Sequence, residues 1–198
     1  MTDNKQLQAL ISGCLKGDRR SQQAVHKLYY GKMKAVCMRY TRDSDQAMDI
    51  LQEGFLKVFN NLEKYTGVGT FEGWVRRIMV NLSIDRFRKL KHDFILLGEN
   101  QSVEDWGEEV EDEVAAENDV IYDITPEQII DAMQQLSPAY RTVFNLYVYE
   151  DYTHQDIAEA LGISVGTSKS NYAKARKNMK KLLLKNLKNL NEQNSNAF

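Results

Sequence analysis

The segment from Tyr152 to Met179 restricts the fold of this chain more than any other part of the sequence. Thr153, with Asp156 three residues later, has the spacing of a capping box at the start of a short helix. Gly162 can adopt the positive φ that ends a helix, and Ser164 can cap a second helix directly after the turn. Two helices joined in this way form a helix-turn-helix. The arrangement favours DNA binding over a plain pair of packed helices.

The second helix of this segment is expected to have two different faces. Its core-facing side chains should be Ser168, Tyr172 and Ala175. The opposite face combines hydroxyl and amide groups, which suit base edges, with cations, which suit phosphates. The residues expected there are Lys169, Ser170, Asn171, Lys174 and Arg176. A basic helix surface is more often simply solvated, but the preceding turn favours a DNA-reading surface here.

Composition excludes several classes of protein. With 198 residues, 42% of them hydrophobic, the chain can form one or two compact domains. Only two prolines interrupt long stretches of helix-forming residues, which predicts an almost all-helical fold. No apolar run approaches the ~20 residues that span a bilayer, and no signal-peptide pattern begins the chain. We expect a cytoplasmic protein whose two cysteines, Cys14 and Cys37, are reduced thiols.

No pattern in the sequence indicates catalysis. The three histidines are scattered and lack metal-ligand spacing. Neither His, Cys nor paired carboxylates form a constellation with a plausible catalytic geometry. We therefore expect no metal, no cofactor, no small-molecule substrate and no enzymatic activity.

The net charge of −2 conceals a strong partition along the chain. Residues 1–91 hold 17 Lys and Arg against 9 Asp and Glu, and residues 141–198 hold 9 against 5. Residues 92–140 hold 14 acidic side chains and no Lys or Arg. Two basic segments flanking an acidic one indicate a polyanionic partner for the basic parts.

These patterns predict an all-α protein with two small helical domains joined by a flexible acidic linker. We place the first domain at residues 1–95, the linker at 96–124, the helix-turn-helix domain at 125–190 and a disordered tail at 191–198. The linker lacks helical periodicity from Glu99 to Asp123, so we expect it to be mostly disordered, with Trp106 as a candidate anchor. Thr125-Pro126 and Ser137-Pro138 have the sequence of helix starts in the second domain.

Helical spacing predicts three long helices in the first domain, at residues 21–40, 46–62 and 71–90. The buried face of the 21–40 helix is expected to hold Ala24, Leu28, Met33, Val36, Cys37 and Tyr40. The 46–62 helix has a polar, acidic face at the spacing i, i+4, i+7 and i+8, formed by Asp45, Asp49, Gln52 and Glu53. From periodicity alone such a face is more often solvated than bound to a partner.

The loop from Lys64 to Thr70 and the helix after it are the second polar region. The loop has two glycines but lacks the Lys-Ser/Thr ending of a P-loop, so it does not indicate a phosphate cradle. The core row of the helix is expected to be Phe71, Trp74, Val75, Ile78 and Leu82. A second row, Val80, Ile84 and Phe87, has Arg76, Arg77, Arg88 and Lys91 on or beside it. Cations beside aromatic residues suit single-stranded nucleic acid, but packing against a neighbouring helix is the favoured interpretation for the three apolar residues.

Three motifs point to one known family. The first is Asp45-Gln-Ala-Met-Asp49-Ile-Leu-Gln52-Glu53-Gly-Phe55. The second is Phe71-x-x-Trp74-Val75-x-x-Ile78-x-x-Asn81-x-x-x-Asp85-x-Phe-Arg88-Lys89. The third is Leu136-Ser-Pro138-x-x-Arg141-x-Val-Phe144, followed by the helix-turn-helix. In order and spacing they resemble the extracytoplasmic-function (ECF) sigma factors of bacterial RNA polymerase, over nearly all of residues 7–182.

The resemblance implies particular partners for the polar surfaces. It implies that Asp49, Gln52 and Glu53 bind core RNA polymerase at the β′ clamp helices, with the β flap as a further contact. It implies that the −10 promoter element is melted and read by Lys64, Tyr65, Thr66, Asn81, Arg76, Arg77, Arg88 and Lys91. The helix-turn-helix would read the −35 element as duplex. A membrane-associated anti-sigma factor is the regulator expected for this family, and the linker would enter the RNA-exit path.

Two positions depart from the family pattern, and one other class of function stays open. Met48 stands where Glu is usual, and Ser168 stands where many members have a buried Val. The alternative function is an autonomous helix-turn-helix regulator whose N-terminal domain senses a ligand or dimerises. The sequence shows no ligand-pocket signature that would support it.

Overall fold

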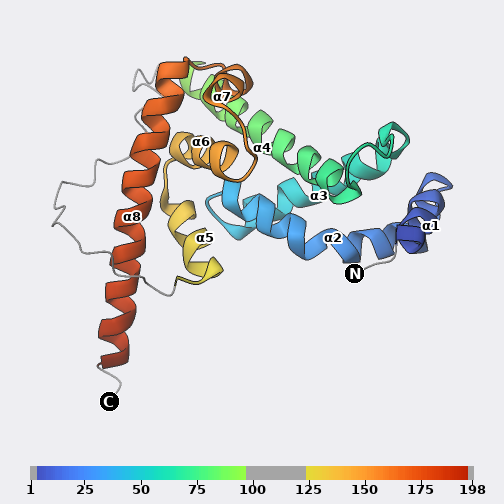
Figure 1. Ribbon diagram of the computed structural model, residues 1–198, viewed down its shortest axis with the longest axis horizontal. Helices are drawn as coiled ribbons and strands as arrows, with labels where there is room; N and C mark the ends of the chain where they lie inside the picture. Colours follow the sequence, from blue (N-terminus) through green and yellow to red (C-terminus); the bar gives the residue numbers. More distant parts are fainter. Residues whose placement is uncertain (1–3, 97–123, 196–198) are drawn as a thin grey trace. The chain divides into compact units, whose positions relative to one another are not determined.

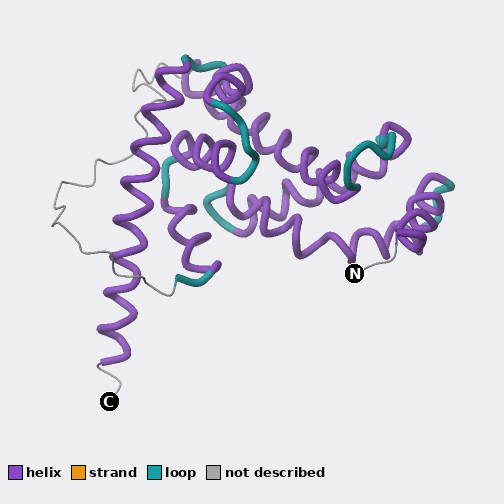
Figure 2. The backbone as a smooth tube through the Cα atoms, in the orientation of Figure 1, coloured by secondary structure: helices purple, strands orange, loops and turns teal. Residues whose placement is uncertain are grey.

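The computed structural model describes residues 4–96 and 124–195, with side chains for 5–92 and 124–186. Within these ranges the chain consists of helices and loops without any strand, so the predicted all-α fold is confirmed (Figure 2). The helices group into two compact units, Met1–Arg86 and Phe87–Phe198. The predicted disorder of the linker and the anchor Trp106 lie outside the described residues.

The first unit contains α1 (Asn4–Leu15), α2 (Arg19–Tyr40), α3 (Ser44–Asn60), the short 3-10 helix η1 (Leu62–Lys64) and most of α4 (Phe71–Leu96). Asp18 begins α2 by accepting hydrogen bonds from the backbone of Arg20 and Ser21, and Asp43 begins α3 by accepting one from Gln46. In Figure 1, α1 packs against α2, and α2 packs against α3.

The buried face of α2 differs in phase from the predicted one. It consists of Val25, Tyr29, Met33, Val36, Cys37 and Tyr40. Two predicted core residues are wrong, because Ala24 is only partly buried and Leu28 is 38% exposed. Positions i, i+4, i+8 and i+11 from Val25 fall on one side of a helix, whereas Leu28 lies about 100° around the helix from Tyr29 and about 140° from Met33.

Helices α3 and α4 meet at a glycine. A Cβ at Gly54 would lie 2.1 Å from the sulfur of Met79, so a larger residue here would have to displace the end of the Met79 side chain. Met79 is fully buried and was missing from the predicted core row, whereas Trp74 and Ile78 are only half-buried. Val80, Ile84 and Phe87 are all buried, which confirms packing as the reason for that second row.

The second unit contains α5 (Pro126–Gln135), α6 (Pro138–Val148), α7 (His154–Leu161) and α8 (Val165–Ser195), with the last turns of α4. Helices α5, α6 and α7 pack against α8 (Figure 1). Thr125 and Ser137 cap α5 and α6 as predicted, each followed by proline. Helix α8 continues to Ser195, beyond the predicted end at residue 190.

A buried arginine connects α5 to α6. Arg141 is almost fully buried, and its guanidinium donates to the backbone carbonyls of Met133, Gln134 and Leu136 at 2.9, 2.8 and 2.6 Å. These carbonyls belong to the last turn of α5 and the residue that ends it, where a helix leaves acceptors without intrahelical donors. Arg141 therefore supplies the C-terminal cap of α5 from the neighbouring helix.

Candidate functional surfaces

The predicted acidic face lies on α3 and is exposed. We call Asp45, Asp49, Gln52 and Glu53 the acidic stripe. Asp45, Asp49 and Gln52 are exposed and Glu53 is half-buried, on the side of α3 opposite the buried Ile50, Leu51 and Val58. The stripe therefore lies outside the hydrophobic core of the first unit and is accessible to a partner.

Two cations of the same unit lie beside the acidic stripe. Arg86 of α4 places Nη1 3.8 Å from Asp49 Oδ2 and Nη2 3.7 Å from Glu53 Oε2. Lys57, one turn after Glu53, places Nζ 3.3 Å from Glu53 Oε1. None of these contacts was predicted from the sequence. The contacts of Arg86 depend on how α3 and α4 meet, so no pattern in the neighbouring residues could indicate them.

The loop between η1 and α4 is fastened at its base by aromatic contacts. The ring of Tyr65 lies 5.1 Å from that of Phe71 and 5.6 Å from that of Trp74, and its hydroxyl donates to the Gly69 carbonyl at 3.3 Å. Lys64 Nζ donates to Asn61 Oδ1. Gly67 and Gly69 have φ values of 79° and 77°, which favour glycine. Thr66 and the tip of the loop are exposed.

The polar candidates on α4 divide between the two units. In the first unit, Asn81 and Arg77 are exposed and Arg76 is half-buried. In the second unit, Arg88 Nε donates to the Ala160 carbonyl at 2.6 Å, and Lys91 Nζ donates to the Gly162 carbonyl at 2.8 Å. Both acceptors lie at the C-terminal end of α7, where unpaired carbonyls and the helix dipole favour a cation. Arg88 and Lys91 are therefore engaged with α7 in this structure.

The helix-turn-helix is present with the predicted caps. The Thr153 side chain and backbone bond reciprocally with Asp156, and the hydrogen bond from the Thr153 hydroxyl lowers the pKa of the Asp156 carboxyl. Helix α7 ends at Gly162 with a φ of 62°. Ser164 Oγ then accepts the backbone N–H of Thr167 at 2.9 Å, in the first turn of α8.

The two faces of α8 agree with the prediction at most positions. Ser168 and Ala175 are fully buried and Tyr172 is half-buried. The Ser168 hydroxyl lies 2.9 Å from His154 Nδ1, so the polar side chain at this core position has a partner on α7. On the other face, exposed side chains are those of Lys169, Ser170 and Arg176, with Lys174 half-buried.

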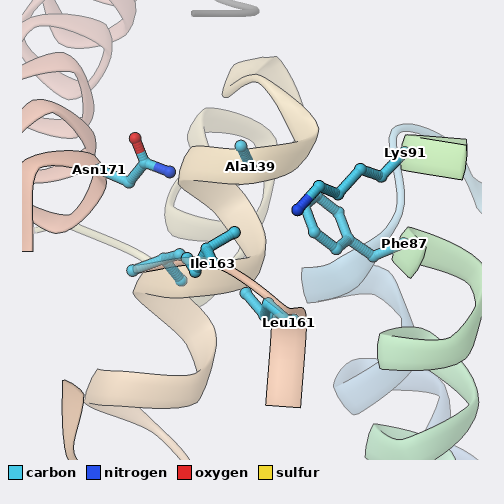
Figure 3. A pocket seen from close by; sticks show the side chains of 7 residues that line it. Phe87, Lys91, Ala139, Leu161, Ile163 and Asn171 are labelled. Carbon is cyan, nitrogen blue, oxygen red and sulfur yellow. The ribbon is translucent and has the colours of Figure 1, made fainter. Parts of the chain in front are cut away.

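Asn171 departs from the prediction. Its side chain is 4% exposed and lines a small pocket of the second unit together with Ala139, Leu161 and Ile163 (Figure 3). The residue lies three positions after Ser168 and four before Ala175, which puts all three on one face of the helix. The prediction that Asn171 faces away from the core is therefore wrong.

Within the described residues two other features are absent. No group of three or more His, Cys, Asp or Glu side chains there could hold a metal ion. No helix among these residues is long and apolar enough to cross a membrane.

Comparison with known families matches both units. Residues 25–92 match the model of sigma-70 region 2, and residues 127–179 match that of sigma-70 region 4. The ECF RNA polymerase sigma factor SigW of Bacillus subtilis is 31% identical over 85% of this chain and 91% of its own length. The ECF RNA polymerase sigma-E factor of Haemophilus influenzae is 28% identical over 85% of this chain and 90% of its own.

Among solved structures, the sigma factor RpoE of Bartonella quintana, in complex with the anti-sigma factor NepR, aligns with this chain. It is 20% identical with a TM-score of 0.46, and the alignment covers 81% of this chain and 95% of that one.

Proposed function

Because this chain belongs to the ECF sigma factors of RNA polymerase, we propose that its three polar surfaces divide between the polymerase and two promoter elements. As a sigma factor it directs promoter recognition in transcription initiation. The observation that supports this division best is the location of each surface within the two matched regions. The acidic stripe lies inside the region 2 match, and the helix-turn-helix lies inside the region 4 match.

In this proposal the acidic stripe binds core RNA polymerase at the β′ clamp helices, and the second unit contacts the β flap. Asp49, Gln52 and Glu53 supply two carboxylates and an amide on one face of α3, with Asp49 69% and Glu53 45% exposed. Exposed carboxylates on a rigid helix suit a partner surface that presents arginine or lysine.

The loop after η1 and the exposed side of α4 read the −10 element. Tyr65, held by its aromatic neighbours, and the exposed Thr66 and Asn81 offer stacking and hydrogen-bonding groups for unpaired bases. Lys64, Arg76 and Arg77 supply cations for the phosphates. For Arg88 and Lys91 to join this set, their hydrogen bonds to the carbonyls of Ala160 and Gly162 must break so that both side chains can contact DNA.

The N-terminal part of α8 reads the −35 element. Lys169 and Ser170 are exposed directly after the turn and are the candidates for base edges. Lys174 and Arg176, further along the helix, are the candidates for phosphate contacts. Asn171 leaves this set because it is buried, so it acts by packing the helix onto the domain.

We also propose a cytoplasmic location, the absence of catalysis and control by a membrane-associated anti-sigma factor. The family membership supports these proposals. The alternative, an autonomous helix-turn-helix regulator, is not favoured, because the similarity to sigma factors covers both units and not the helix-turn-helix alone.

The test is a charge reversal in the acidic stripe. Asp49→Arg combined with Glu53→Arg should abolish co-elution of the full-length protein with purified core RNA polymerase and abolish run-off transcription. Because Asp49 is exposed and Glu53 keeps 45% of its side chain exposed, the free energy of unfolding should change by about 0.5 kcal/mol or less for each. A variant with Glu63→Arg and Glu127→Arg, which makes the same change of charge elsewhere, should still co-elute. Co-elution of the stripe variant would contradict the proposal.

A further inference from the structure

Arg86 lies between the two carboxylates proposed to bind the polymerase. One guanidinium reaches both side chains, with Nη1 on the side of Asp49 and Nη2 on the side of Glu53, at 3.8 and 3.7 Å. All three side chains are in contact with solvent: Arg86 is 38%, Asp49 69% and Glu53 45% exposed. A partner that approaches the acidic stripe therefore meets a cation that already belongs to this chain.

The fold fixes Arg86 in this place. Helices α3 and α4 are in contact where the Met79 side chain packs onto Gly54. Arg86 follows Met79 by seven residues, two helical turns, so both project from nearly the same face of α4. On α3, Glu53 immediately precedes Gly54 and Asp49 lies one turn before Glu53. The contact that closes the core therefore also brings the guanidinium to the stripe.

We propose that Arg86 is an internal competitor for the acidic stripe, which lowers the affinity of this sigma factor for core RNA polymerase. The inference rests on the proposed function of the stripe and adds a residue that acts against it. Before a cationic side chain of the polymerase can pair with both carboxylates, Arg86 has to leave them or share them. Arg86 also places a positive charge beside the incoming positive charge.

The geometry indicates a weak competitor. The distances are near the limit of an ion pair, and exposed pairs of this kind contribute little because water screens them. Removal of Arg86 should therefore tighten binding by about two- to tenfold, not by orders of magnitude. The gain should shrink as salt rises, because the Debye length falls from about 10 Å at 0.1 M to about 3 Å at 1 M.

A different function for Arg86 would give the opposite sign. If the guanidinium served to hold Asp49 and Glu53 in the orientation that the polymerase needs, its removal would weaken binding. Competition and positioning are thus distinguished by the direction of the change in Kd.

The experiment measures the Kd of the full-length protein for purified core RNA polymerase at 0.1 and 0.5 M salt. Arg86→Gln should bind about two- to tenfold more tightly at 0.1 M, with a smaller gain at 0.5 M. Arg86→Lys keeps the charge and should stay closer to the unmodified protein. Arg19→Gln removes the same charge from the first turn of α2 and should not tighten binding. Thermal melts check that each variant is folded.

Two results would overturn the inference. One is a folded Arg86→Gln protein whose Kd for core RNA polymerase is unchanged or higher. The other is an Arg19→Gln protein whose affinity increases as much as that of Arg86→Gln. A Glu53→Gln variant separates this failure from that of the proposed function. If Glu53→Gln weakens binding while Arg86→Gln does not tighten it, the stripe is the polymerase site and only the competition is wrong. If neither variant changes the Kd, both proposals are wrong.

Discussion

Replacement of Arg141 by methionine tests whether the cap of α5 holds the second unit together. Methionine fills much of the volume of the aliphatic part of arginine but donates no hydrogen bond. Three bonds from the guanidinium are lost, to the carbonyls of Met133, Gln134 and Leu136. At about 1.5–3 kcal/mol for each bond to a charged group, the gross loss would approach the whole stability of a small domain.

Two terms reduce that sum. The Met133 carbonyl also accepts the backbone N–H of Leu136 at 3.1 Å, so it keeps a donor. Removal of Arg141 also ends the cost of keeping a charge in an almost fully buried place. We therefore expect Arg141→Met to destabilise the second unit by about 3 kcal/mol.

Amide hydrogen exchange of the full-length protein is the assay, because it reports on each unit separately. A loss of about 3 kcal/mol should lower the protection of core amides in α5–α8 by roughly 100-fold. Amides of α2 and α3 serve as the internal reference and should keep their protection. Lys180→Met, an exposed substitution on α8, should change protection little. A fall of less than tenfold for Arg141→Met would show that the cap contributes little to the stability of the second unit.

Three further predictions concern single positions. Asn171→Ala should lower the stability of the second unit without changing promoter sequence preference, because Asn171 is buried. Lys169→Ala should instead relax the preference at one position of the −35 element and lose about 1–3 kcal/mol of binding free energy there. Binding to promoter and random duplexes measures both effects. Cys14 and Cys37 should both resist thiol reagents at pH 8 until the protein is denatured, because both are buried and burial raises the pKa of Cys37 to about 12; rapid labelling of the native protein would contradict this. The pKa of Asp156 is lowered by the hydrogen bond from a threonine hydroxyl, so its contribution to stability is present above the usual carboxyl pKa of about 4 and is lost as pH falls through the lowered value. Asp156→Asn should accordingly lower the Tm at pH 7. At pH 3 the difference in Tm between the variant and the unmodified protein should be smaller. An equal difference at both pH values would argue against the capping effect.

Local signals predicted the helix-turn-helix well, because each of its boundaries depends on a residue and its immediate neighbours. Thr153 caps α7, Gly162 ends it with a positive φ and Ser164 caps α8, all as the sequence indicated. The family membership rests on the same kind of information, since the motifs that predicted it are contiguous stretches.

The predictions failed where the burial of a side chain depended on its angular position around the helix. Asn171 was placed on the DNA-reading face because an amide suits base edges, but its position between Ser168 and Ala175 puts it on the core face. Leu28 was placed in the core because it is apolar, but the buried face of α2 is centred on Tyr29 and Met33. In both cases the angle around the helix decided burial, and the residue type did not.

Arg86 shows a different limit. Its partners lie more than thirty positions earlier in the sequence, on another helix. Nothing in the residues around Arg86 distinguishes it from the other arginines of α4. Its pairing follows from the crossing of α3 and α4, which is a property of the packed unit and not of a motif.

The contact of Gly54 with Met79 has a mechanical consequence for the first unit. Because no side chain separates the backbone of α3 from the Met79 side chain, α4 cannot slide along α3 without expelling a fully buried methionine. The contact therefore resists shear between the two helices. In the proposed function, a load on the loop end of α4 during DNA opening would pass to the polymerase-binding surface of α3 through this contact.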